Sequence, residues 1–194
     1  MRDDTARRLK IVGISSMVFF GIYVVTFNLQ FSGLQQLQKA LVSDALPFVL
    51  IAPLHGVRMM AAWFFGWWSI VVLGPSAAYF YVVSSATVTF DVGFHLLVLT
   101  YLCSGPLAFS LLRLVLGGAA RPMRLEWRYI MLAGGISAVV NAIALGFYLA
   151  PDLDGQLMLW WVIGRVIASM LGLMLVLLAT LGALRMLKMQ LERV

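Results

Sequence analysis

The sequence predicts an all-α, polytopic membrane bundle of about six transmembrane helices with both termini in the cytoplasm. Of the 194 residues, 62% are hydrophobic and only 11% are charged. The mean hydropathy of +0.97 lies far above that of a soluble domain. At roughly 20 residues a span, the chain accommodates about six spans with short loops. We therefore expect a single membrane domain over residues 1–194.

The charged residues predict how the helices cross the membrane. The net charge is +6 and the pI is near 9.9, and the basic residues cluster at the ends of apolar segments. The positive-inside rule explains this pattern, so we expect no nucleic-acid partner. The groups predicted to be cytoplasmic are Arg2, Arg7, Arg8 and Lys10; Arg113, Arg121, Arg124 and Arg128; and Arg185, Lys188 and Arg193. The opposite loops hold Asp44, Asp91, Asp152 and Asp154, with Lys39.

With both ends on one side, the number of crossings is even, and the apolar segments fit six. The predicted spans are about 11–29, 45–65, 69–87, 92–116, 129–150 and 157–183. After the first span, the apolar residues of Phe31–Ala40 recur at helical spacing, which is typical of a short helix on the membrane surface; a tethering linker is the alternative. Trp67 and Trp68 suit a tight turn at the headgroup level between spans two and three.

Two prolines fall inside predicted spans. Pro53 should bend the second span, because a proline removes one backbone hydrogen bond, and Pro106 should interrupt the fourth. The last span is predicted to continue as a helix, so that residues 184–194 form a cytoplasmic extension.

The extension has apolar residues at the spacing of a coiled-coil seam: Leu184, Leu187, Leu191 and Val194. It is either a contact for a protein partner or a second copy, or a membrane-surface helix whose Arg185, Lys188 and Arg193 meet anionic lipid. Small residues on the last span, Gly164, Ala168 and Gly172, favour close packing within the bundle; dimerisation is the alternative.

His55 and Arg58 lie in the apolar stretch Leu46–Phe65. A cation there costs several kcal/mol unless it is paired. Three residues apart, the two side chains share one helix face. Either Arg58 reaches the inner headgroups while His55 caps carbonyls released by Pro53, or both form a site for an anionic ligand, with Arg58 as the fixed charge.

Arg165 is the second embedded arginine. It either pairs with Asp91 or Asp154 at the outer surface or faces the same cavity as Arg58. In the second case the cavity is net positive and attracts a carboxylate, a phosphate or a lipid headgroup. Asn141 and Tyr148 could line the same space, although a helix-to-helix hydrogen bond is an ordinary use of Asn141. The candidate ligand-binding residues are His55, Arg58, Asn141 and Arg165.

Other chemistries find little support in the sequence. We expect no cofactor; the alternative is a haem or a bacteriochlorophyll, which needs one axial imidazole from His55 or His95. The single cysteine, Cys103, excludes an internal disulfide. There is no embedded carboxylate, no Gly-x-Ser-x-Gly and no HExxH, so we expect no enzyme.

The stretch Leu50–Val83 resembles the bacterial membrane-associated sensor domains of the MASE class. The matching positions are Pro53, Gly56, Gly66, Trp67, Gly74 and Ala77. The six-span, glycine-rich layout is also similar to the substrate-binding S components of energy-coupling-factor transporters. Both resemblances imply a small bundle that binds a ligand or a partner.

We therefore expect a non-enzymatic module of the bacterial inner (cytoplasmic) membrane. It should bind or sense a small anionic or amphipathic ligand, contact membrane lipids, and pass occupancy to a protein partner through the last helix. An accessory or structural subunit of a larger membrane complex, with or without a pigment, is one alternative. The substrate-binding subunit of a transporter is another.

Overall fold

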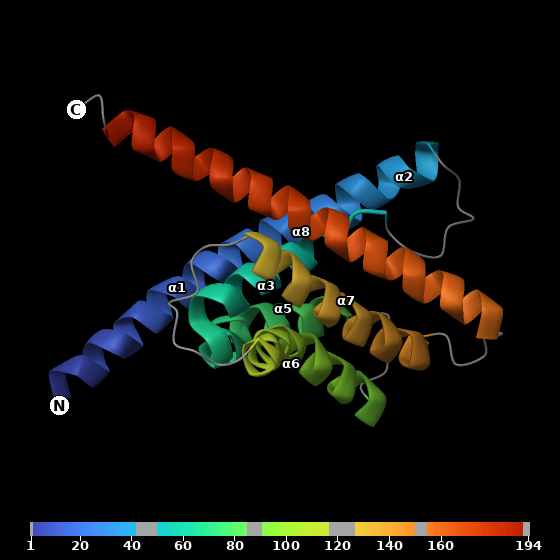
Figure 1. Ribbon diagram of the computed structural model, residues 1–194, viewed down its shortest axis with the longest axis horizontal. Coiled ribbons are helices and arrows are strands. Elements are labelled where there is room, and N and C mark those ends of the chain that lie inside the picture. The colour runs from blue at the N-terminus through green and yellow to red at the C-terminus, as the bar shows by residue number, and fades with distance from the viewer. Residues whose placement is uncertain (1, 42–49, 85–90, 117–126, 150–154, 192–194) are drawn as a thin grey trace.

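A computed structural model describes residues 2–41, 50–84, 91–116, 127–149 and 155–191, and within these ranges every regular element is a helix (Figure 1). The elements are α1 (Arg2–Asn28), the π-helical η1 (Leu29–Leu34), α2 (Gln35–Leu41), α3 (Pro53–Phe65), the 3-10 helix η2 (Gly66–Trp68), α4 (Ser69–Val72), α5 (Gly74–Ser84), α6 (Val92–Val115), α7 (Trp127–Leu149) and α8 (Gly155–Leu191). The predicted all-α fold class is confirmed.

Four helical stretches among the described residues are long and apolar enough to cross a membrane. They are Lys10–Ala40, Val92–Val115, Trp127–Tyr148 and Gly155–Ala183. A fifth span results if Pro53–Val72 and Gly74–Val83, which are bent by 57° relative to each other, count as one. The chain is thus a multi-pass helical membrane protein, while the sixth predicted span is not confirmed.

The first helix does not end near Leu29, where the predicted span ends. It continues through the π-helical turn Leu29–Leu34 into α2. No proline stops it, and the lone Gly33 is compatible with a helix. The π-helical turn carries a buried polar residue, Gln30, which accepts a hydrogen bond from the Leu54 backbone N–H at 3.4 Å.

Pro53 does not bend a longer helix, as the sequence led us to expect, but begins α3. Residues 45–49 of the predicted span lie outside the described residues, and Leu50–Ala52 are not helical. At the first position of a helix, proline lacks only an N–H that would have had no helical partner. It therefore releases no carbonyl for His55 to cap, and that predicted role of His55 is wrong.

The chain passes very close to α8 just before α3 begins. The Ala52 N–H donates to the Ala168 carbonyl at 3.0 Å. At Gly172, an added Cβ would collide with the Ala52 carbonyl and would lie 2.7 Å from the Pro53 nitrogen. These two small residues of α8 thus pack within the bundle and allow the start of α3 to lie inside it.

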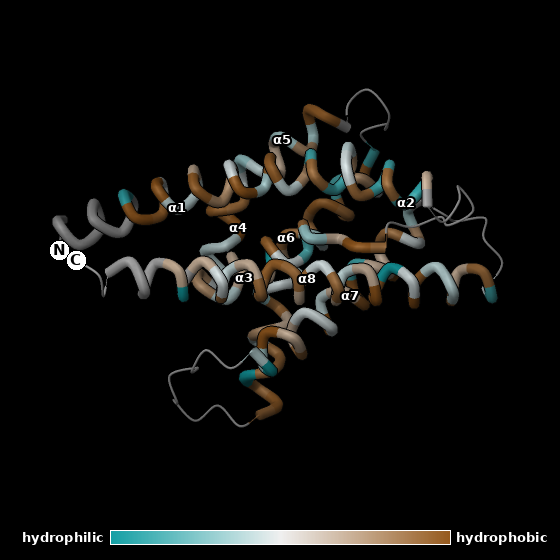
Figure 2. The backbone as a smooth tube through the Cα atoms, turned by 90° about the horizontal axis from the view of Figure 1, so that it is seen from above, coloured by the Kyte–Doolittle hydropathy of each residue, from teal (hydrophilic) through white to brown (hydrophobic). Residues whose placement is uncertain are grey.

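A core between α3, α6, α7 and α8 holds the fold together. Met59, Ala108, Ile130 and Leu173 are among its buried members. The first helix lies on one side, where it packs mainly against α3, α4 and α5 (Figure 2). The start of α1 and the end of α8 lie at the same end of the molecule (Figures 1 and 2).

The last helix, α8, is a single helix of 37 residues, about 55 Å long at 1.5 Å per residue. It is therefore longer than the hydrocarbon core of a bilayer, as predicted. The coiled-coil seam predicted at Leu184, Leu187, Leu191 and Val194 lies outside the residues whose side chains are described.

Candidate functional site

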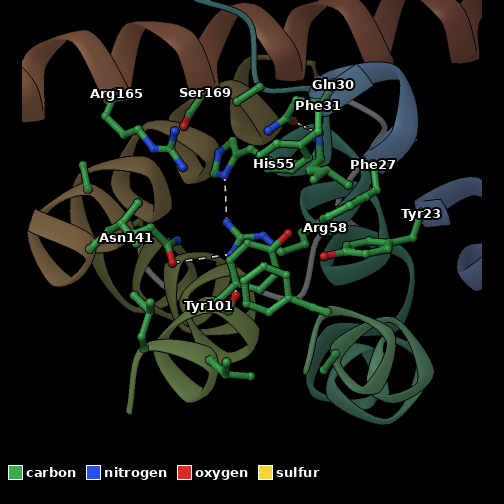
Figure 3. Close-up of a pocket in the computed structure, with 18 residues that line it drawn as sticks. Tyr23, Phe27, Gln30, Phe31, His55, Arg58, Tyr101, Asn141, Arg165 and Ser169 are labelled. Carbon is green, nitrogen blue, oxygen red and sulfur yellow. Dashed lines mark hydrogen bonds between the residues drawn. The ribbon is translucent and has the colours of Figure 1, made fainter. Parts of the chain in front are cut away.

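A cavity of about 130 Å³ lies inside the bundle, between the first helix and helices α3, α5, α6, α7 and α8 (Figure 3). A water needs roughly 10–15 Å³ measured in this way, so there is room for a small molecule. The lining residues are Tyr23, Phe27, Gln30, Phe31, Ala52, Leu54, His55, Arg58, Ala77, Phe80, Leu97, Val98, Tyr101, Asn141, Ala142, Leu145, Arg165 and Ser169. All four candidate residues from the sequence are among them.

Arg58 is buried in the bundle, with only 4% of its surface exposed. Its Nη1 donates to the Tyr101 carbonyl at 2.7 Å and to Asn141 Oδ1 at 3.4 Å, and its Nη2 donates to His55 Nδ1 at 2.9 Å. The guanidinium carbon also lies 3.5 Å from the centre of the Tyr101 ring, a cation–π geometry. Arg58 thus turns into the protein and does not reach the headgroups, so the first predicted alternative is wrong.

These contacts orient Arg58 but leave its charge uncompensated. Every partner is neutral: a carbonyl, an amide oxygen, an imidazole nitrogen and an aromatic ring. The Nε of Arg58 is buried and has no hydrogen-bond partner among the described residues. No acidic residue occurs among those that line the cavity.

The tautomer of His55 follows from its two partners. Arginine can only donate, so His55 Nδ1 accepts from Arg58, and the ring proton must lie on Nε2. That Nε2 lies 3.1 Å from the Gly134 carbonyl and donates to it. His55 is therefore a neutral ring that links α3 to α7 and fixes the position of Arg58.

The Tyr101 carbonyl, on α6, accepts hydrogen bonds from two side chains. Arg58 donates to it at 2.7 Å and the Ser104 hydroxyl at 3.4 Å. Pro106 also lies inside α6, but the carbonyl that it leaves without a helical donor is that of Leu102, four residues earlier. The contact between Arg58 and Tyr101 therefore does not depend on the proline.

Asn141 is held by a small polar network between α6 and α7. Its Nδ2 donates to Ser104 Oγ at 2.6 Å and to the Ser137 carbonyl at 2.7 Å, and Ser137 Oγ donates to Ser104 Oγ at 2.9 Å. This leaves Oδ1 on the side of Arg58. Asn141 thus combines the predicted helix-to-helix hydrogen bonding with a place in the cavity wall.

Arg165 reaches the cavity from α8, and Figure 3 shows its guanidinium turned toward the same hollow as Arg58. Two arginines, from α3 and α8, thus line one cavity. Of its two predicted partners, Asp91 instead accepts from the Phe94 N–H at 2.7 Å and caps α6, while Asp154 lies outside the described residues. Tyr148 does not line the cavity but packs near Phe94.

Several lining residues were not expected from the sequence. Tyr101 contributes through its carbonyl and its ring, both of which contact Arg58, and nothing in the sequence around it indicated this. Gln30 is a polar residue in an apolar run, although it was assigned to a loop next to the first span. The aromatic residues Phe27 and Phe31 carried no signal, since aromatic residues are common throughout this sequence.

A tetrapyrrole does not fit His55. Both ring nitrogens are used, Nδ1 by Arg58 and Nε2 by Gly134, so ligation of a metal would break the contact that holds Arg58 or the contact with α7. His95 lies on the surface of the bundle, where its Nδ1 bonds the Asp91 carbonyl at 2.7 Å. It does not line the cavity.

No protein-family model, no curated protein and no solved structure matches the chain. The resemblances to the MASE-class sensor domains and to the transporter S components therefore remain predictions.

Proposed function

We propose that this protein is a non-enzymatic membrane module that binds a small anionic, amphipathic molecule in the cavity. The observation that carries the proposal is that two arginines, Arg58 and Arg165, line one cavity without an acidic residue in its lining. Cations within a membrane are costly unless they are neutralised. An anion bound between them supplies the missing charge.

The chemistry of the site favours a carboxylate or a phosphate as the anionic group. A guanidinium presents planar N–H donors that match these oxyanions. His55, Asn141 and the Tyr101 carbonyl hold Arg58 in place, so little side-chain entropy is lost on binding. The remaining lining is largely apolar, which suits a ligand with an apolar body.

We further propose six membrane passages with both termini in the cytoplasm of a bacterium, in its inner membrane. The start of α1 and the end of α8 lie at the same end of the molecule (Figure 1), which supports an even number of passages. The bent pair of helices between Pro53 and Val83 then accounts for two of the six. The basic groups of the sequence fall on the cytoplasmic side in this arrangement.

A sensing role follows if occupancy alters the position of α8. This helix carries Arg165 and Ser169 in the cavity wall and continues to Leu191. A shift of α8 on ligand binding would thus reach a protein partner or the lipid surface at the C-terminal end of this helix. The same geometry serves the substrate-binding subunit of a transporter, which differs in releasing the ligand on the other side.

The test is ligand-dependent thermal stabilisation of the purified protein in lipid nanodiscs, with octanoate as the probe. A ligand at 100 times its Kd stabilises the folded state by about 2.7 kcal/mol, and each kcal/mol raises Tm by about 2–4 °C in a chain of this size. We expect octanoate to raise Tm by several degrees and 1-octanol, which has no charge, to have little effect.

Arg58→Ala should abolish the octanoate effect while the protein remains folded. Arg185→Ala is the matched control, because Arg185 is an exposed cation on α8 outside the cavity. An unchanged octanoate shift in Arg58→Ala, or an equal loss in both variants, would refute the proposed site.

A further inference from the structure

The cavity has two chemically different sides. Figure 3 shows Arg165 and Asn141 on one side and Tyr23 and Phe27, from the first helix, on the other, with the guanidinium of Arg58 between them. The first side offers positive charge and the second offers aromatic surface. A molecule that contacts both has an anionic end and an apolar body.

The aromatic side is formed by the first helix, which is the least buried of the four long apolar helices among the described residues. The first helix packs mainly against α3, α4 and α5, and most of its own surface faces outward (Figure 2). Phe31 both lines the cavity and has 38% of its surface exposed. One helix therefore separates the cavity from the surrounding lipid.

That helix has a built-in irregularity where it meets the cavity. The π-helical turn Leu29–Leu34 includes Gln30 and Phe31, both of which line the cavity. π-Helical turns are rare, occur frequently at functional sites and are places where helices bend. Gln30 holds this turn to the start of α3 through its 3.4 Å hydrogen bond with the Leu54 N–H.

Resting on the proposed function, we infer that the ligand is a single-chain organic acid dissolved in the bilayer, and that it reaches the cavity sideways from the lipid. The carboxylate meets Arg58 and Arg165, while the chain lies along Phe27 and Phe31. Displacement of α1 away from α5, with the π-helical turn as the hinge, opens the path, and the hydrogen bond from Leu54 to Gln30 holds it closed.

The ligand class is tested with a series of probes in nanodiscs: acetate, octanoate, hexadecanoate and 1-octanol. Both chain-bearing acids should raise Tm, because a long chain can extend past Phe31 into lipid, whereas acetate and the alcohol should not. If acetate protects as well as octanoate, the inferred apolar chain of the ligand is wrong, and the cationic site of the proposed function stands. If octanoate protects and hexadecanoate does not, the cavity is closed to the bilayer and the sideways path is refuted.

The path is tested by fastening the first helix to α5. The rings of Phe20 and Tyr79 lie 6.1 Å apart, and neither residue lines the cavity. Phe20→Cys and Tyr79→Cys, introduced together with Cys103→Ser, can be joined by a short, reducible, thiol-reactive linker. We expect radiolabelled octanoate to exchange at least about ten-fold more slowly after linking, and normally again after reduction.

The order of loading provides the internal control. Protein loaded with octanoate before linking should retain it, and protein linked while empty should fail to load. Normal loading of the linked, empty protein would overturn the sideways path without affecting the proposed function. Absence of octanoate binding in the unlinked protein would overturn the proposed function itself.

Gln30→Leu tests, without a linker, whether the hydrogen bond from the Leu54 N–H to Gln30 holds the path closed. Loss of one hydrogen bond should speed octanoate exchange by at least about three-fold. Asn28→Leu is the matched control, since Asn28 donates to the Val24 carbonyl of its own helix at 2.8 Å and does not line the cavity. Equal exchange rates in Gln30→Leu and the wild type would show that this hydrogen bond does not hold the path closed.

Discussion

Arg58 is the central residue of the proposed binding site. A buried cation is destabilising unless its donors are satisfied and its charge is balanced. The Tyr101 carbonyl, Asn141 and His55 satisfy donors of Arg58, but none of them carries a negative charge. The unliganded protein therefore holds its guanidinium in an oriented and electrostatically incomplete state, which an anion would relieve.

An anion supplied by the protein itself should have the same effect as the ligand. Asn141→Asp places a carboxylate where Oδ1 now lies, 3.4 Å from Arg58 Nη1. The hydroxyls of Ser104 and Ser137 can rotate to donate to it, whereas the hydrogen bond from Nδ2 to the Ser137 carbonyl is lost and opposes part of the gain. We expect the unliganded variant to be stabilised by about 1–3 kcal/mol, measured as a higher Tm, and to lose the octanoate effect.

Asn28→Asp is the control for this substitution, because it makes the same chemical change on the exposed face of α1. It should keep the octanoate effect and gain no stability. A lower Tm for Asn141→Asp, combined with an intact octanoate shift, would show that Asn141 does not face the charge of the site.

At the scale of single elements, the start of α3 inside the bundle is the decisive feature. Pro53 begins the helix, Gln30 accepts from the Leu54 N–H, and Gly172 leaves room for the Ala52 carbonyl. Together they place His55 and Arg58 on the first turns of α3, beside α6 and α7. Of these three residues, Gly172 of α8 is the easiest to test by substitution.

Gly172→Ala should be strongly destabilising. Its Cβ would collide with backbone atoms of Ala52, which have no side-chain freedom to move away. The cost of such overpacking is typically about 1–3 kcal/mol, and the displaced α3 should also bind octanoate more weakly. Unfolding of the detergent-solubilised protein measures the first effect.

Gly182→Ala is the matched change on the same helix, since nothing lies within 4 Å of its added Cβ. It should leave stability unchanged or raise it by up to about 1 kcal/mol, the helix preference of alanine over glycine. Equal stability of the two variants would mean that the chain does not pass over Gly172 as described.

At the scale of the whole molecule, the prediction that is easiest to refute is that both termini lie on the same side of the membrane. In the background Cys103→Ser, single cysteines replace Lys10, Arg185 or Gly155, all of which lie on the surface. In sealed vesicles of one orientation, an impermeant maleimide should label the first two from the same side and Gly155→Cys from the other. Labelling of Lys10→Cys and Arg185→Cys from opposite sides would refute an even number of passages.

Composition was sufficient to predict the helical membrane bundle, because the need to satisfy backbone hydrogen bonds in lipid leaves few alternatives. It also directed attention to Arg58, Arg165, His55 and Asn141, since polar residues are rare in such segments. The start of α3 was not predictable, because a proline such as Pro53 gives the same sequence signal inside a bent helix and at the first position of a helix. The continuation of α1 through a π-helical turn depends on the contact of Gln30 with α3, which no local pattern reveals.

The most direct test of the central claim is a distance between a bound carboxylate and Arg58 in the membrane. Solid-state NMR of the protein with ¹⁵N-labelled arginine and octanoate labelled with ¹³C at the carboxyl carbon measures it, with Arg58→Lys identifying the Arg58 signal. The account predicts a dipolar coupling that corresponds to about 4 Å between the carboxyl carbon and a guanidinium nitrogen of Arg58. Bound octanoate with no coupling to Arg58 would contradict it.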